Sequence, residues 1–217
     1  QEFTEWLQYV NFGGVSPMSK LRVENVREKP WNVKYWGVGN EAWGCGGNMT
    51  AEYYANIYRQ YVTFMTSWNN DSKIFRIASG ANSSDYHWTE VLMRDIPHNM
   101  LEGVALHHYS VIDWNKKGSA KDFSEQEYFL ILKRALFMEE LVTKHSTIMD
   151  KYDPAKQIAL VVDEWGGWYD VEPNTNPGFL YQQNTMRDAI LAGATLNIFH
   201  NHSDRVRMAN LAQTVNV

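Results

Sequence analysis

Short apolar runs recur along the sequence, and polar residues follow each of them. Their length and composition predict strands over residues 33–39, 74–79, 103–108, 158–162 and 195–200. The runs do not alternate strictly between apolar and polar residues, which is typical of strands buried on both faces of a parallel sheet. We therefore expect the five runs to form the interior of an α/β fold.

Helical spacing of apolar residues appears in the longer segments between these runs. It predicts helices over residues 50–68, 124–149 and 177–192, with Thr50 as the N-cap of the first. At the start of the sequence, Phe3, Trp6, Leu7 and Val10 fall on one helical face, and nothing caps that helix. Residues 211–217 also stop within an apolar pattern. Both ends lead us to expect a piece of a longer chain.

The alternation of strands and helices predicts either an α/β barrel or a doubly wound sheet. Polar residues at the predicted strand ends favour the barrel, whose sites are built at the carboxyl ends of several strands. These residues are 40–41, 79–80, 107–109, 163–164 and 200–202. The sequence has no Gly-rich dinucleotide loop and no phosphate-binding P-loop. We predict a TIM (β/α)8 barrel, of which residues 1–217 supply roughly strands four to eight.

Composition excludes some classes of partner. The 217 residues carry a net charge of −5 without a basic stripe, which argues against a nucleic-acid partner. No apolar stretch approaches the length of a membrane span, so we expect no membrane partner. Cys45 is the only cysteine, which excludes an internal disulfide and slightly favours the cytoplasm over a periplasmic or secreted location. The compartment stays open on sequence grounds.

Two glutamates at predicted strand ends carry the chemical interpretation. Glu41 follows a strand among Trp and Gly residues, and Glu164 follows another strand in a similar setting. A carboxylate among aromatic rings costs free energy unless a function requires it. Glycoside hydrolysis requires two carboxyl groups flanking one bond, and retention of configuration requires them roughly 5 Å apart. We assign Glu41 as the acid/base and Glu164 as the nucleophile.

Neighbouring residues offer alternatives to this assignment. An isolated Glu41 would more often cap the following helix. Asp163 competes with Glu164, but successive strand residues point to opposite faces, so only one of the two should face the site. We favour Glu164, because Trp165 and Gly166 follow it, and expect Asp163 to be a salt-bridged structural acid.

A histidine pair and a tyrosine end the third predicted strand. We expect one of His107 and His108 to face the site and the other to pack outward, while Tyr109 bonds the nucleophile. Together with His200 and His202 these histidines could form a metal site, which is the rival interpretation. No ligand spacing such as HExxH occurs, and we predict neither a metal nor a cofactor.

These residues together resemble glycoside hydrolase family 51, the α-L-arabinofuranosidases. The motifs that carry the resemblance are YWGVGNE at residues 35–41, WGCGGNM at 43–49, LHHY at 106–109 and DEW at 163–165. Residues 196–200 through 208–217 are similar to the last barrel strand and helix of that family. The resemblance covers essentially the whole sequence.

The resemblance implies a role for each matching residue. Glu41 matches the acid/base of the fourth strand and Glu164 the nucleophile of the seventh. Asn40 matches the residue that bonds the sugar 2-hydroxyl, while His107 and Tyr109 match a pair that lines the site. Trp168 matches an aromatic residue at the rim, and Gln213 a polar residue that reaches the furanose.

The resemblance also implies parts that these 217 residues do not supply. The first three barrel strands would bring a glutamate and an asparagine that grip the arabinose hydroxyls, and a β-sandwich would pack on the barrel. The expected function is a retaining α-L-arabinofuranosidase acting on arabinoxylan, arabinan or derived oligosaccharides, homo-oligomeric as a whole protein. The alternatives are an endo-glucanase or xylanase on a similar barrel, and a non-catalytic carbohydrate-binding fragment.

Overall fold

A five-stranded parallel sheet forms the centre of the computed structural model, which describes residues 1–68 and 73–212. The strands are β1 (Tyr35–Val38), β2 (Phe75–Asn82), β3 (Gly103–Ser110), β4 (Ala159–Gly167) and β5 (Val206–Leu211). The α-helices are α1 (Glu2–Asn11), α2 (Pro17–Glu24), α3 (Ala51–Thr63), α4 (Tyr86–Asp95), α5 (Glu125–Ala135), α6 (Met138–Tyr152) and α7 (Met186–Asn201). Short 3₁₀ turns cover His98–Met100 and Pro177–Phe179.

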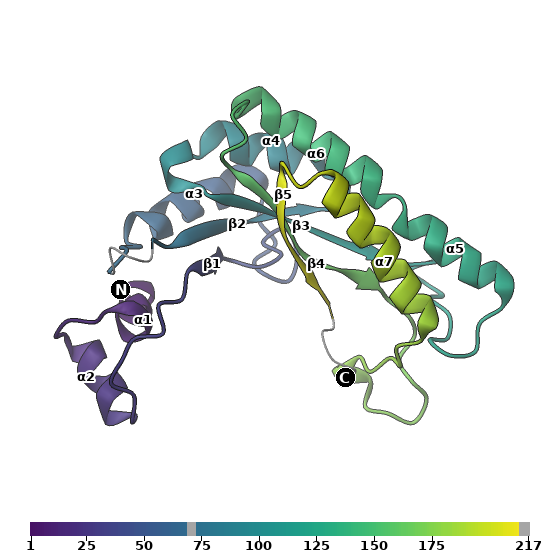
Figure 1. Cartoon of the computed structure of the whole chain (residues 1–217), viewed down its shortest axis with the longest axis horizontal. Helices are drawn as coiled ribbons and strands as arrows, with labels where there is room; N and C mark the ends of the chain where they lie inside the picture. Colours follow the sequence, from purple (N-terminus) through teal and green to yellow (C-terminus); the bar gives the residue numbers. More distant parts are fainter. Residues whose placement is uncertain (69–72, 213–217) are drawn as a thin grey trace.

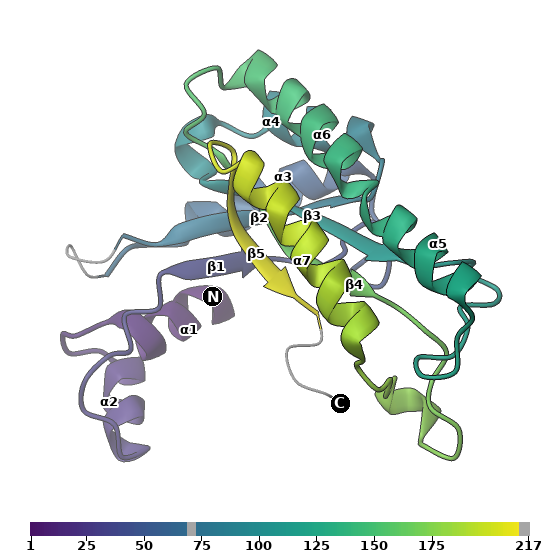
Figure 2. The ribbon, with the colours of Figure 1, turned by 45° about the vertical axis from the view of Figure 1, so that its right-hand side comes forward.

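The strands lie side by side in chain order, and every pair is parallel. Helices α3 to α7 cover one face of the curled sheet, and α1 and α2 lie at its β1 edge, where Phe3 of α1 packs against Trp36 and against Tyr61 of α3 (Figures 1 and 2). A doubly wound sheet has helices on both faces, whereas this arrangement is an open half-barrel. Sequential parallel strands with crossover helices on one face bring all five carboxyl ends to a single edge.

Apolar residues bury both faces of the sheet, as the sequence pattern predicts. The convex face, under the helices, carries Val104, Leu106, Leu160 and Val162 in the main core. The concave face carries a smaller cluster that includes Ile77, Ala105, Ala159 and Val161. Burying each large apolar side chain contributes about 1.5–3 kcal/mol, so the central strands provide a rigid base for the residues at their ends.

The predicted strand over residues 195–200 is wrong. These residues lie in helix α7, which begins after a capping box between Thr185 and Asp188 and buries Leu191, Thr195 and Ile198 at helical spacing. The fifth strand is β5, which the sequence interpretation assigned partly to a helix. The predicted helix over residues 177–192 accordingly begins nine residues later, at Met186.

The other predicted strands and helices are present in the structure, with different boundaries. Thr50 caps α3 by accepting a hydrogen bond from the backbone of Tyr53, and α1 begins without a side-chain cap. The predicted helix over residues 124–149 is two helices, α5 and α6, separated by a turn at Leu136 and Phe137. In the part of the chain that the structure describes, no helix has the length and apolar character that spanning a membrane would require.

Candidate active site

A tight turn after β1 positions Glu41. Backbone amides of Gly44 and Gly46 both donate to the Glu41 carbonyl, at 2.8 and 3.0 Å. Glu41 itself has φ +41°, in the left-handed region that favours glycine. A Cβ on Gly46 would lie 1.6 Å from the Asn40 carbonyl oxygen, so only glycine fits there. The cluster of Trp and Gly in the sequence therefore serves the folding of this turn.

Buried hydrogen bonds fix the same turn to β2. The Ala42 amide donates to Ser79 Oγ at 3.1 Å, and the indole of Trp43 donates to the Gly80 carbonyl at 3.1 Å. Tyr54 of α3 bridges the two strands, because its hydroxyl donates to the Val38 carbonyl and accepts from the Ser79 amide. The backbone that carries Glu41 is thus tied to neighbouring elements on two sides.

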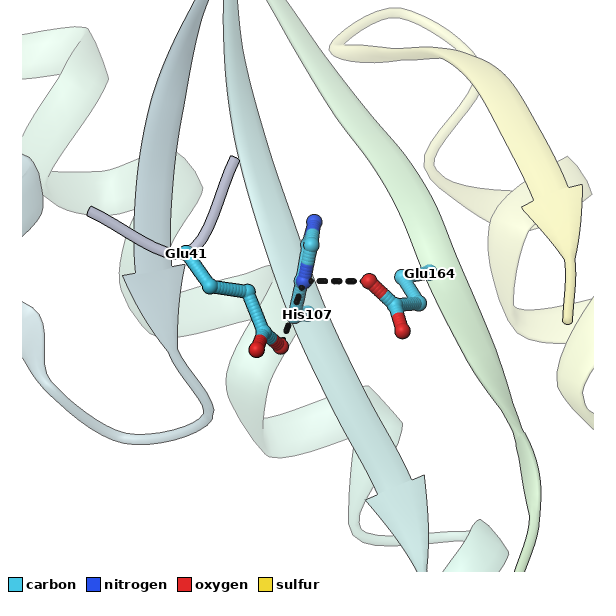
Figure 3. A group of neighbouring side chains, drawn as sticks. All are labelled: Glu41, His107 and Glu164. Carbon is cyan, nitrogen blue, oxygen red and sulfur yellow. Dashed lines mark hydrogen bonds and ion pairs between the residues drawn. The ribbon is translucent and has the colours of Figure 1, made fainter. Parts of the chain in front are cut away.

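The side chain of Glu41 does not cap a helix; it points to His107 at the end of β3. His107 Nδ1 lies 3.0 Å from Glu41 Oε1 and 2.8 Å from Glu164 Oε2. Figure 3 shows this nitrogen between the two carboxylates, which come from the turn after β1 and from β4. One histidine nitrogen therefore joins the two glutamates that the sequence interpretation selected.

Asp163 also contacts His107, contrary to the expectation that only one member of the Asp163–Glu164 pair could face the site. Its Oδ1 lies 3.2 Å from His107 Nε2. The strand register explains this. Ala105 pairs with Val161, but His107 pairs with Glu164, so β4 holds one more residue than β3 over this stretch. Such a bulge breaks the alternation of side chains between faces.

The charge on this cluster follows from its geometry. The side chain of His107 is only 8% exposed. Burial of the ring opposes protonation, but the carboxylates of Asp163 and Glu41 outweigh it and raise the pKa of His107 to about 9. The imidazole is therefore a cation at neutral pH, with oxygens of Glu41, Asp163 and Glu164 within 3.2 Å of its nitrogens.

Tyr109 holds the other oxygen of Glu164, as predicted. Its hydroxyl donates to Glu164 Oε1 at 2.5 Å. Burial and this bond together raise the pKa of Tyr109 above its ordinary value, so the hydroxyl stays protonated and remains a donor. Trp168 packs edge-on against Tyr109, with ring centroids 4.8 Å apart. The predicted rim aromatic thus lies next to the predicted site.

The sequence interpretation missed two residues of this region, Cys45 and Trp114. The Cys45 thiol donates to Glu41 Oε2 at 3.3 Å, and this bond raises the pKa of the thiol. The four-residue separation of Cys45 from Glu41 in a helix-like turn was the available signal. Trp114, 61% exposed, packs against Trp168 with ring centroids 5.8 Å apart. Nothing in the sequence around Trp114 distinguishes it from a surface residue.

The histidines do not gather into the rival metal site. His108 points away from His107, bonds Ser83 and packs against Phe137, and burial lowers the pKa of His108 to about 4. His202 bonds Glu139 of α6 at 2.6 Å. His200 lies in the last turn of α7 and His202 is the C-cap of that helix, before β5 begins, at the opposite end of the sheet from Glu41.

A smaller group remains to be considered as a metal site. Glu41, His107 and Glu164 each offer one atom within 4.8 Å of the others, a spacing at which side chains can share an ion. In the structure both carboxyl groups contact His107 Nδ1 directly, and we assign none of the three residues to a metal. Asn40 is exposed beside Glu41. Gln213 lies outside the described residues.

Comparison with known proteins gives the family. The protein-family model described as "Alpha-L-arabinofuranosidase 1 domain" matches residues 1–126, which is more than half of the chain. A second family model, "Alpha-L-arabinofuranosidase C-terminal domain", matches residues 163–217. The chain belongs to the α-L-arabinofuranosidase family. The resemblance to glycoside hydrolase family 51 drawn from the motifs is therefore confirmed.

Relatives in this family match the chain from end to end. An intracellular exo-α-L-arabinofuranosidase of Bacteroides ovatus is 50% identical over all of this chain and 42% of that protein. An intracellular exo-α-(1→5)-L-arabinofuranosidase of Acetivibrio thermocellus is 29% identical over 97% of this chain and 43% of its own length. The chain thus spans less than half the length of the curated family members it matches.

Solved structures of the family agree with the fold. The GH51 arabinofuranosidase from Xanthomonas axonopodis pv. citri superimposes on all of this chain and 44% of its own, with a TM-score of 0.96 and 50% identity. The α-L-arabinofuranosidase from Thermotoga maritima, solved with arabinose, gives a TM-score of 0.80 at 28% identity over 99% of this chain and 41% of its own. The half-barrel is therefore an arrangement found within this family.

Proposed function

We propose that this chain is the catalytic part of a retaining exo-α-L-arabinofuranosidase. Glu164 is the nucleophile and Glu41 is the acid/base. The observation that carries the proposal is the placement of both carboxylates on the same nitrogen of His107, with one oxygen of each within 4.8 Å of the other. Retaining glycosidases need their carboxyl groups about 5–5.5 Å apart, and inverting ones about 6.5–9.5 Å.

The reaction proceeds in two displacements. Glu164 attacks C1 of the arabinofuranosyl unit while Glu41 gives its proton to the leaving glycosidic oxygen. Glu41 then removes a proton from water, which attacks C1 and releases the sugar from Glu164. Asn40 bonds the 2-hydroxyl, Gln213 reaches the furanose, and Trp168 forms an aromatic wall at the rim. The names of the relatives support this substrate class, arabinose-containing oligo- or polysaccharides.

The same proposal covers the rest of the protein. The five strands correspond to strands four to eight of a (β/α)8 barrel, and residues 1–217 form the C-terminal part of that barrel. Three further strands and a β-sandwich complete the protein, which we expect to be a homo-oligomer. The word "intracellular" in the names of the relatives supports a cytoplasmic location.

The nucleophile is tested in the full-length protein with 4-nitrophenyl α-L-arabinofuranoside. Glu164→Ala should lose the release of nitrophenol, and added azide should restore it with inverted configuration in the arabinosyl azide. The matched control is Glu140→Ala, which alters an exposed glutamate of α6 paired with Lys144 and should leave turnover unchanged. Unaffected turnover in Glu164→Ala would overturn the assignment.

The acid/base is tested by comparing leaving groups. Glu41→Ala should retain the first step on substrates with good leaving groups, such as dinitrophenolate, and lose it on arabino-oligosaccharides. Azide should react with the arabinosyl-enzyme of this variant and give a product of retained configuration. An equal loss on all substrates would contradict an acid role for Glu41, and release of xylose or glucose chains in place of arabinose would favour the endo-acting alternative.

A further inference from the structure

We propose that Asp163 is a positioning residue that keeps both nitrogens of His107 protonated, so that one N–H serves both catalytic carboxylates in turn. The inference rests on the proposed roles of Glu41 and Glu164. Asp163 touches neither substrate nor the reacting atoms; it acts through the imidazole ring. It is distinct from the structural acid that the sequence pattern predicts at this position.

The bulge in β4 makes this contact possible. In a regular strand the side chains of Asp163 and Glu164 would point to opposite faces of the sheet. Because β4 holds an extra residue opposite β3, both reach His107, from its two different nitrogens. Bulges near active sites commonly redirect a side chain in this way.

The three contacts determine the protonation of the ring. A neutral imidazole has one N–H and one bare nitrogen, and a bare nitrogen repels a carboxylate oxygen. Here Nε2 faces Asp163 at 3.2 Å, while Nδ1 faces Glu41 and Glu164 at 3.0 and 2.8 Å. Glu41 Oε1 is in hydrogen-bond geometry with Nδ1, whereas Asp163 Oδ1 accepts no hydrogen bond from the described residues and pairs with Nε2 through charge, so only the doubly protonated ring is attracted on both sides. A buried cation beside the carboxylates of Asp163 and Glu164 is stable where an unpaired one would not be.

A fixed N–H between two carboxylates suits a reaction that moves charge from one to the other. At the start Glu164 is ionised and Glu41 carries the proton. When Glu164 bonds to C1 and Glu41 gives its proton to the leaving oxygen, the negative charge passes from Glu164 to Glu41. Nδ1–H of His107 lies within bonding distance of both oxygens and can follow the charge without moving. Asp163 holds the ring in that place.

The surroundings of His107 leave these carboxylates as its charged neighbours within the described residues. Glu41 comes from the turn after β1, and Asp163 and Glu164 come from β4. On the β2 side, the residue paired with His107 is the uncharged Asn82. The Cys45 thiol and the Tyr109 hydroxyl reach the ring only through the glutamates.

The variant Asp163→Asn, made in the full-length protein, tests whether the negative charge of Asp163 is required or only its shape. The amide keeps the shape of Asp163 but removes the negative charge that favours the cation, so the ring should lose a proton at a lower pH than in the wild type. The basic limb of the pH profile of kcat/KM should move down by about 1–3 pH units, with a smaller change at pH 5.5. The control is Asp204→Asn, an exposed carboxylate paired with Lys156, which should leave the profile unchanged.

A spectroscopic readout makes the test independent of activity. In protein labelled with ¹⁵N-histidine, His107 is assigned from the signal lost in His107→Gln. Both nitrogens should be protonated at pH 7 in the wild type, and the ring should titrate about 1–3 pH units lower in Asp163→Asn than in the wild type. A neutral His107 in the wild type, or equal titration in both proteins, would overturn the proposal for Asp163. If the wild type lacks arabinofuranosidase activity, the proposed function fails while the histidine titration still decides the role of Asp163.

Discussion

The hydroxyl of Tyr109 donates a hydrogen bond of 2.5 Å to Oε1 of Glu164. Bonds to charged groups contribute about 1.5–3 kcal/mol. Tyr109→Phe should therefore lower kcat/KM for an aryl arabinofuranoside about ten- to a hundredfold. The control is Tyr53→Phe, which removes an exposed hydroxyl on α3 and should change nothing. Full activity in Tyr109→Phe would show that Glu164 does not depend on this donor.

The pKa of His107 predicts how stability depends on pH. The folded value of about 9 lies above the ordinary 6.5, so the stabilisation is full below pH 6.5 and is lost as pH rises through 9. The free energy of unfolding of the wild type, measured relative to His107→Gln, should fall by about 3 kcal/mol over that window. Denaturant titrations at several pH values measure this difference. A difference that does not change with pH would contradict the cationic state of His107.

Gly46 offers a steric test of the turn that carries Glu41. A Cβ on Gly46 would overlap the Asn40 carbonyl oxygen, so Gly46→Ala must displace residues 40–41. We expect a loss of about 1–3 kcal/mol in stability together with most of the activity. Gly193→Ala is the matched control, because no atom lies within 4 Å of that added methyl, and in helix α7 it should stabilise by up to about 1 kcal/mol. Normal turnover in Gly46→Ala would show that the reaction does not depend on the geometry of this turn.

Cys45 provides a chemical probe of the same carboxylate. Its exposed thiol donates to Glu41 Oε2, so an alkyl group on sulfur would occupy the space beside the proposed acid/base. Iodoacetamide should inactivate the wild type, and an arabinose-containing competitor should slow the loss. Cys45→Ser keeps a donor, should stay active, and should resist the reagent. Equal inactivation of Cys45→Ser would place the sensitive group elsewhere.

Sequence reasoning predicted the parts of the site that follow from strand ends. Parallel strands bring their carboxyl ends to one edge, so the sequence alone groups Glu41, His107, Tyr109 and Glu164. The division of labour between His107 and His108 also followed, because neighbouring strand residues point to opposite faces. The first four predicted strands overlap observed ones for the same reason: they are apolar on both faces.

Two predictions from the sequence were wrong, the strand over residues 195–200 and the orientation of Asp163, and each has its own physical cause. A six-residue apolar run such as 195–200 reads equally well as a buried strand or as part of a buried helix, and the capping box at Thr185 decides for the helix. The contact between Asp163 and His107 depends on a change of register between β3 and β4. Register is set by packing across the sheet, and no local pattern in the sequence records where an extra residue is accommodated.

The left-handed backbone of Glu41 has a consequence for the evolution of this site. A side chain at φ +41° costs about 1–2 kcal/mol that glycine would not incur. Replacement by glycine would therefore relax the turn while removing the carboxylate that the proposed chemistry requires. At this one position selection for a sturdier fold and selection for turnover act against each other, so the survival of glutamate here is itself a mark of function.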